Sequence, residues 1–102
     1  MNISKDRNEI EKLYRAVLTL RTEDECRRFF TDLCTPAELR AMEQRLQVAE
    51  LLRKGEVYSR IEEITGASSA TISRVNRCLQ AGEAGYSIAL DRWESVSEET
   101  GK

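Results

Sequence analysis

Apolar residues recur at three- and four-residue steps along almost the whole chain, and this spacing limits the fold more than any other feature. Near the start of the chain, one such stripe contains Ile10, Leu13, Tyr14, Val17 and Leu18. A period near 3.6 is typical of an amphipathic helix, whereas a half-buried strand alternates every second residue. No alternating run occurs, and the 102 residues include a single proline. We therefore expect one all-α domain with short connections.

Pairs of capping residues predict where the first two helices begin. Asp6 is followed three residues later by Glu9, and Thr22 by Glu25, which is the spacing of a capping box. The two helices, within residues 1–34, present more apolar surface than a monomer of this size easily covers. We expect them to dimerise the chain, although an intramolecular bundle fits the same pattern.

A central helix is expected over residues 35–55. Thr35 supplies an N-cap, and Glu38 completes the capping box. Pro36 is tolerated in the first turn, because the backbone N–H that proline lacks would have no helical partner there. Gly55 can take the left-handed conformation at which many helices end. The apolar face is broad enough for burial on two sides. Its members are Leu39, Met42, Leu46, Val48, Ala49, Leu51 and Leu52.

Residues 65–77 read TGASSATISRVNR, a run of small side chains followed by two arginines. A phosphate-binding loop, a surface turn and the contact edge of a DNA-reading helix are all candidates. A phosphate-binding loop would need more glycines, a lysine and a preceding strand, which are missing here. Upstream, Val57, Ile61 and Ile64 lie on one side of a short helix. The spacing therefore predicts a helix-turn-helix over residues 57–80.

The second helix of this motif is expected to enter the major groove of DNA. A positive φ is expected at Gly66, and Ile72, Val75 and Leu79 form the inner face. Small residues at the helix start permit a close approach to the bases, and arginines can contact guanine edges or phosphates. The predicted DNA contacts are Arg60, Ser68, Ser69, Ala70, Ser73, Arg74 and Arg77. A capped surface helix whose arginines bind nothing is the alternative.

Charge supports this interpretation locally rather than globally. The chain has 16 basic and 18 acidic residues, so its total charge does not indicate an anionic partner. Between residues 66 and 82, however, the only charged side chains are those of Arg74 and Arg77. The weakly acidic total leaves a second hypothesis open, a helical dimer that binds another protein and no DNA.

The C-terminal segment predicts one more helix, over residues 83–95. Tyr86, Ile88, Leu90 and Trp93 are expected to pack it against the domain. Residues 96–102 are expected to be a frayed tail.

Other functional classes lack their signals. The chain has no histidine, the commonest general base, and no nucleophile paired with a base, so we expect neither an enzyme nor a cofactor. Cys26, Cys34 and Cys78 are widely spaced and odd in number, which favours buried free thiols over disulfides or a metal site. No apolar run would span a bilayer and no leader precedes the first helix, so a cytoplasmic protein is expected.

Three motifs within residues 32–79 resemble the DNA-binding half of the Trp repressor. They are LCTPAE at 33–38, the arginine in QRLQVAELL at 44–52, and GASSATISR at 66–74. The whole chain, including LDRW at 90–93, is still more similar to the Trp-repressor-like YerC/YecD family. The resemblance implies an intertwined, all-helical homodimer that regulates transcription as a repressor. Its two helix-turn-helix motifs would read half-sites about one helical turn apart.

The resemblance also implies an effector pocket. In the Trp repressor, arginines at the positions of Arg45 and Arg74 flank an indole ring, and the residue matching Thr35 holds the amino-acid end. The family has glycine where this chain has Val75 and serine where it has Cys78. Because a β-branched side chain would occupy the space of the ring, and a thiol is a poor partner for an ammonium group, we expect no tryptophan corepressor.

Overall fold

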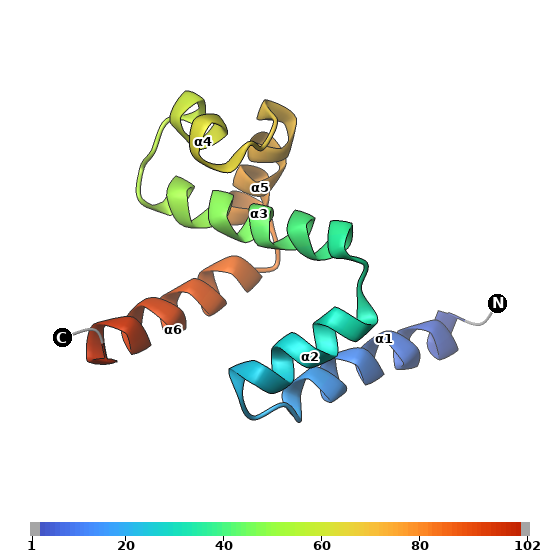
Figure 1. Ribbon diagram of the computed structural model, residues 1–102. Helices are drawn as coiled ribbons and strands as arrows, with labels where there is room; N and C mark the ends of the chain where they lie inside the picture. Colours follow the sequence, from blue (N-terminus) through green and yellow to red (C-terminus); the bar gives the residue numbers. More distant parts are fainter. Residues whose placement is uncertain (1–2, 101–102) are drawn as a thin grey trace. The chain divides into compact units, whose positions relative to one another are not determined.

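The computed structural model describes the backbone of residues 3–100 and the side chains of residues 11–96. This described part is built of helices without strands, which confirms the all-α prediction (Figure 1). Two compact units are present, residues 1–39 and residues 40–102. The helices are α1 (Ile3–Leu18), α2 (Glu23–Leu33), α3 (Pro36–Arg53), α4 (Tyr58–Thr65), α5 (Ser69–Ala81) and α6 (Gly85–Thr100).

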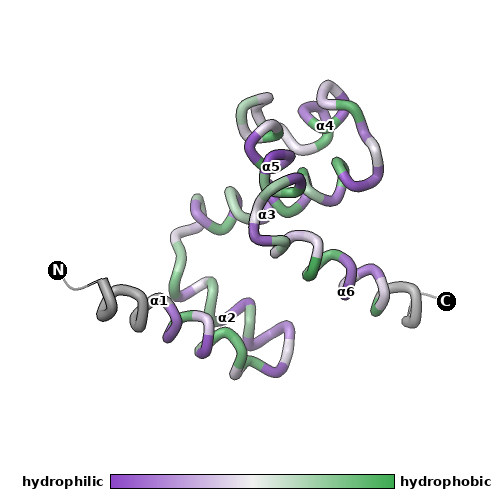
Figure 2. The backbone as a smooth tube through the Cα atoms, turned by 180° about the vertical axis from the view of Figure 1, so that it is seen from behind, coloured by the Kyte–Doolittle hydropathy of each residue, from purple (hydrophilic) through white to green (hydrophobic). Residues whose placement is uncertain are grey.

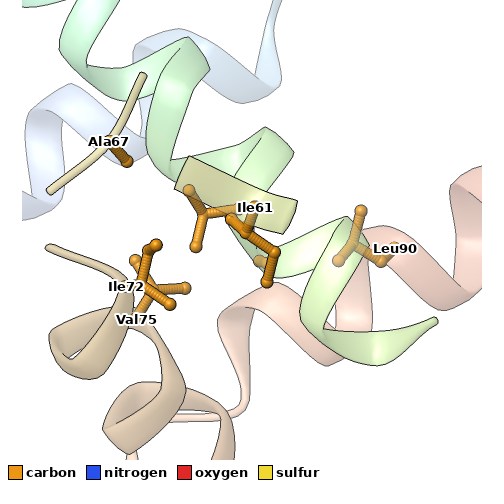
Figure 3. Close-up of a cluster of buried hydrophobic side chains, with 7 residues drawn as sticks. Ile61, Ala67, Ile72, Val75 and Leu90 are labelled. Carbon is orange, nitrogen blue, oxygen red and sulfur yellow. The ribbon is translucent and has the colours of Figure 1, made fainter. Parts of the chain in front are cut away.

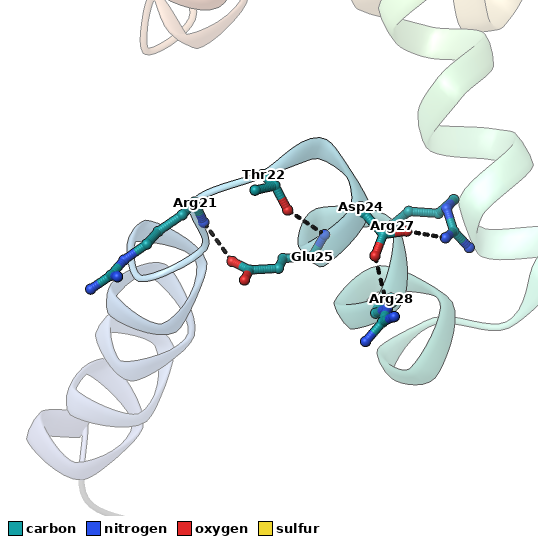
Figure 4. Close-up of polar contacts among 6 residues, drawn as sticks. All are labelled: Arg21, Thr22, Asp24, Glu25, Arg27 and Arg28. Carbon is teal, nitrogen blue, oxygen red and sulfur yellow. Dashed lines mark hydrogen bonds and ion pairs between the residues drawn. The ribbon is translucent and has the colours of Figure 1, made fainter.

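The first unit contains α1, α2 and the start of α3, and the chain reverses direction between α1 and α2 (Figure 1). The predicted start of α2 is confirmed, because the Thr22 hydroxyl accepts the Glu25 N–H at 3.0 Å (Figure 4). Helix α1 begins at Ile3, so the start predicted at Asp6 is wrong and Asp6 lies inside the helix. Among residues 11–39 no side chain is buried. This unit therefore has no described core of its own.

Polar contacts reinforce the first turns of α2. The Glu25 carboxylate accepts the backbone N–H of Arg21 at 2.8 Å, and Asp24 pairs with Arg27 and, at 2.9 Å, with Arg28 (Figure 4). Acidic residues near a helix N-terminus also interact favourably with the helix dipole. The pairs are exposed, so each contributes only a few tenths of a kcal/mol, roughly.

The second unit has a small apolar core to which every helix of the unit contributes. Ile61 of α4 and Ile72 of α5 are fully buried, and Leu90 brings α6 onto the same cluster (Figure 3). An ion pair also joins α6 to α3, because Arg53 contacts Asp91. The core residues are Val48, Ala49, Ile61, Ala67, Ile72, Val75 and Leu90.

Helix α3 follows its sequence signals at both ends. The Thr35 hydroxyl accepts the Glu38 N–H at 3.1 Å, while the Glu38 carboxylate accepts the Thr35 N–H at 2.8 Å. After Arg53 the chain turns through Gly55, whose φ is +86°. The N–H groups of Gly55 and Glu56 donate to carbonyls of the last turn, a Schellman arrangement. The predicted central helix is thus observed within its expected limits.

Four apolar residues expected in the core are exposed. Val57 is the N-cap of α4 and 65% exposed, and Ile64 is 42% exposed, so only Ile61 of that predicted stripe is buried. On α6, Ile88 and Trp93 are 48% and 60% exposed, while Leu90 is buried. Helical periodicity places residues on one side of a helix, but α4 and α6 each touch the core along a line narrower than their apolar faces.

Two further expectations need correction. Helix α6 begins at Gly85 and continues to Thr100, beyond the end predicted near Ser95; residues 101 and 102 of the predicted tail lie outside the described part. The cysteines are free, as expected, but none is buried: Cys26 and Cys34 are half-buried and Cys78 is exposed. Figure 2 shows apolar and polar positions interleaved along the helices.

Candidate nucleic-acid interface

Helices α4 and α5 form the predicted helix-turn-helix, joined by residues 66–68 (Figure 1). Gly66 ends α4 in the left-handed conformation with φ +73°, as expected. Ala67 is buried against the core, which explains the need for a small side chain at that position. Ser68 then begins α5, because its hydroxyl accepts the Thr71 N–H at 3.2 Å.

The turn is held by a cluster of hydrogen bonds around Thr65. The Thr65 hydroxyl donates to the Ile61 carbonyl at 2.7 Å and accepts the Ala67 N–H at 3.0 Å. The Gln44 side-chain amide, which comes from α3, donates to the Thr65 carbonyl at 3.1 Å. A carbonyl in the last turn of a helix has no partner within its own helix, so Gln44 supplies the missing donor. The orientation of α5 thus depends on α3 as well as on α4.

A second link joins the two helices of the motif directly. The Asn76 side-chain amide donates to the Tyr58 hydroxyl at 3.3 Å. Tyr58 is the first residue of α4, and Asn76 lies in the middle of α5. Beside this contact, Ile72 and Val75 pack inward, so α5 is fixed by its inner face and its outer face remains open.

That outer face carries most of the predicted DNA contacts. Ser69, Ala70, Arg74 and Arg77 are exposed, and Ser73 is half-buried. Within the described chain, neither Arg74 nor Arg77 makes an ion pair, so both guanidinium groups are available to an anion. We call Ser69, Ala70, Ser73, Arg74 and Arg77 the α5 outer face.

The two remaining predicted contacts are already engaged. Arg60 pairs with Glu63, with 3.0 Å between Nη1 and Oε2. Ser68 caps α5, and its hydroxyl also lies 3.2 Å from that of Thr71. A phosphate contact by either residue would have to compete with these partners.

The residues of the expected effector pocket occupy different environments. Val75 is only 1% exposed and belongs to the core, which agrees with its role as an apolar core residue. Arg45 is half-buried, and Arg74 and Cys78 are exposed. Thr35 belongs to the other compact unit, where it caps α3. An apolar hollow of about 470 Å³ adjoins Cys78, and its other lining residues are Gly82, Glu83, Gly85, Tyr86 and Ala89.

The capping box of α3 perturbs one titrating group. The backbone N–H of Thr35, assisted by its hydroxyl, holds the pKa of Glu38 below the ordinary glutamate value of 4.5. The donors stabilise the charged carboxylate relative to the acid. The lowered pKa of Glu38 is therefore a consequence of the helix cap.

The described residues contain no group of three or more acidic or cysteine side chains able to hold a metal ion. None of the described helices is both long enough and apolar enough to cross a membrane.

The sequence that forms these helices matches a known protein family. Residues 8–94 match the family model described as Trp repressor protein. The chain belongs to the Trp repressor family. YerC of Bacillus subtilis (strain 168) is 48% identical to it over 101 residues, covering 98% of this chain and 97% of YerC. The resemblance indicated by the sequence motifs, to the YerC branch of this family, is confirmed.

Two solved structures of the family share the fold. A crystal structure of a proposed Trp repressor from Staphylococcus aureus gives a TM-score of 0.83 at 47% identity, covering 92% of this chain and 95% of that one. A Trp-repressor-like protein from Eubacterium eligens gives 0.82 at 45% identity, covering 85% and 90%. Both likenesses extend well beyond the helix-turn-helix and cover most of the chain.

Sequence reasoning missed the role of Gln44 in this arrangement. A signal was present, because Gln44 falls on the same stripe of α3 as Ala41, Val48 and Leu51, at steps of three and four. A polar residue on an inward stripe needs a hydrogen-bond partner. The sequence did not show which carbonyl would be that partner, since Thr65 lies 21 residues away.

Proposed function

We propose that this member of the Trp repressor family is a sequence-specific DNA-binding transcriptional regulator, acting as a repressor, and that it has no enzymatic activity. The observation that supports this most directly is the α5 outer face. Two arginines without ion-pair partners in the described chain stand beside small residues on a helix whose opposite side is buried. Such a helix can enter a major groove without moving the core.

A selection from random-sequence duplexes at low salt tests this function. A defined motif should be enriched, and its binding should weaken steeply with salt because phosphate contacts release counterions. Arg74→Ala or Arg77→Ala should reduce affinity for the selected duplex by about 1–3 kcal/mol for an arginine that reads a base. Arg92→Ala, which removes an exposed cation from α6, is the matched control. Equal affinities of all three variants would rule out the α5 outer face as the contact surface.

We also propose that the chain is a homodimer of one functional domain, with residues 1–34 as the dimerising helices. The absence of buried side chains among residues 11–39 supports a partner that covers them. In the single chain, Tyr14 is 60% and Leu18 83% exposed. Such faces are typical of obligate dimers.

Leu18→Glu tests the dimer. Because Leu18 is exposed in the single chain, the substitution should not disturb a monomer, but it should shift sedimentation from a dimer towards a monomer. Lys12→Glu changes the charge at another exposed site of α1 and is the control. A Leu18→Glu protein that sediments like the unsubstituted protein would contradict the assignment of this face.

For the effector, we propose that tryptophan is not a corepressor of this protein. The burial of Val75 in the core supports this, because the side chain cannot swing away without opening a cavity. Operator affinity should therefore be the same with and without millimolar tryptophan. A tryptophan-dependent rise in affinity would overturn the proposal.

The alternative function is a helical dimer that binds another protein. The exposed Ile88, Trp93 and Val96 on α6 favour it, since aromatic and aliphatic side chains are common at interfaces. The same selection discriminates: no enrichment of any duplex at low salt would favour a protein partner over DNA.

A further inference from the structure

The two helices of the helix-turn-helix carry opposite charge. Helix α5 has Arg74 and Arg77 and no acidic residue. Helix α4 has Arg60 together with Glu62 and Glu63, so its side chains sum to one negative charge. In motifs of this kind the first helix crosses the sugar-phosphate backbone, where a positive helix would bind every sequence equally.

Arg60 is the one cation of α4, and Glu63 partly neutralises it. The two side chains are 57% and 68% exposed, and their charged atoms lie 3.0 Å apart. An ion pair this exposed contributes little to folding stability. The ion pair has a larger effect on the binding of a polyanion such as DNA. The Glu63 carboxylate already holds the Arg60 guanidinium, and its negative charge repels a phosphate.

We propose that Glu63 determines the specificity of DNA binding by withholding Arg60 from phosphates. Sequence-independent affinity is then kept low, and binding depends on the α5 outer face. This inference depends on the proposed DNA-binding function. Glu63 would lower the affinity for every duplex. The loss of affinity matters most on non-specific DNA, because no favourable base contacts offset it there.

Glu63→Gln and Glu62→Gln form a matched pair for the test. Each removes one exposed negative charge from α4, but only Glu63 is paired with Arg60 in the described chain. Fluorescence anisotropy would measure the affinity of each protein for the selected duplex and for a scrambled duplex between 50 and 200 mM salt, conditions in which phosphate contacts dominate the salt dependence. Glu62→Gln controls for the general change in charge.

The expected result is a steeper salt dependence in Glu63→Gln alone. On scrambled DNA, the slope of log K against log salt is negative, and it should become more negative by about 0.9 for each Arg60 that gains a phosphate contact. Such a slope corresponds to about eightfold in affinity per tenfold change in salt. The ratio of selected to scrambled affinity should fall, and adding Arg60→Ala to Glu63→Gln should restore the original slope.

Equal slopes for Glu63→Gln and Glu62→Gln would overturn the inference, including the case in which neither protein binds scrambled DNA. A steeper slope that persists in the Arg60→Ala background would also overturn it. Failure of the proposed function gives a different result, namely no duplex that any of the proteins prefers over the scrambled one.

Discussion

The hydrogen bond from Gln44 to the Thr65 carbonyl gives the most direct test of how the helix-turn-helix is positioned. Gln44→Met keeps the length and approximate volume of the side chain but removes the donor. The contact is partly buried, with 3.1 Å between Nε2 and the carbonyl oxygen. A typical intramolecular hydrogen bond contributes about 0.5–1.5 kcal/mol net, and an acceptor left without a partner in a buried site costs about 1–3 kcal/mol.

Because Thr65 is only half-buried, water can reach its carbonyl in the variant, and the cost should lie near the lower end of that range. We expect Gln44→Met to lower the free energy of unfolding by about 1 kcal/mol. With a urea m-value of about 2 kcal/mol per molar, the midpoint should fall by about 0.5 M. Urea unfolding followed by circular dichroism measures this shift, at one fixed protein concentration because of the proposed dimer.

The control is Gln47→Met, which makes the same change on the same helix at an exposed position without a hydrogen bond in the described chain. It should leave the midpoint unchanged within roughly 0.25 M, since exposed substitutions usually alter stability by no more than about 0.5 kcal/mol. Equal midpoints for Gln44→Met and Gln47→Met would show that the Thr65 carbonyl does not depend on Gln44 for its hydrogen bond.

Four further substitutions test other parts of the fold. Gly66→Ala should cost about 1–2 kcal/mol in thermal unfolding, because the φ of +73° disfavours any β-carbon although the nearest other atom would lie 4.0 Å away. Ile61→Ala should cost about 2–5 kcal/mol and Ile64→Ala less than about 1 kcal/mol, since only Ile61 is fully buried; similar losses would contradict the observed core. The carboxyl carbon of Glu38, followed by NMR, should titrate below pH 4.5. Thr35→Ala removes the hydroxyl and the γ-methyl group but keeps the backbone N–H, so it should raise the pKa of Glu38 in part. Since the folded pKa is the lower one, this cap stabilises α3 above pH 4.5 and is lost as the pH falls through the folded value.

Caps and turns were the features most accurately predicted from the sequence. The Thr35–Glu38 box, the ends of α3 at Gly55 and of α4 at Gly66, and the Ser68 cap all occur where their residue types indicate. Each of these depends on atoms within a few residues of one another, so local chemistry determines them.

Predictions of burial were less accurate where helices meet. Ile61 and Ile64 share a periodic stripe, yet only Ile61 reaches the core, and Trp93 of α6 is exposed while Leu90 is buried. Periodicity fixes the side of a helix on which a residue lies. The width of the contact depends on the neighbouring helices and on how closely they approach.

The residue types alone indicated the helical class, the caps of α2, α3 and α5, the position of the helix-turn-helix and, through its motifs, the Trp repressor family. The packing of the helices showed that Ile61 is buried while Ile64 is exposed, and that Gln44 holds the turn from another helix. The physical reason is the range of the interactions. Capping and periodicity act within about one turn of the chain, whereas burial and side-chain partnership depend on how separate segments come together in space.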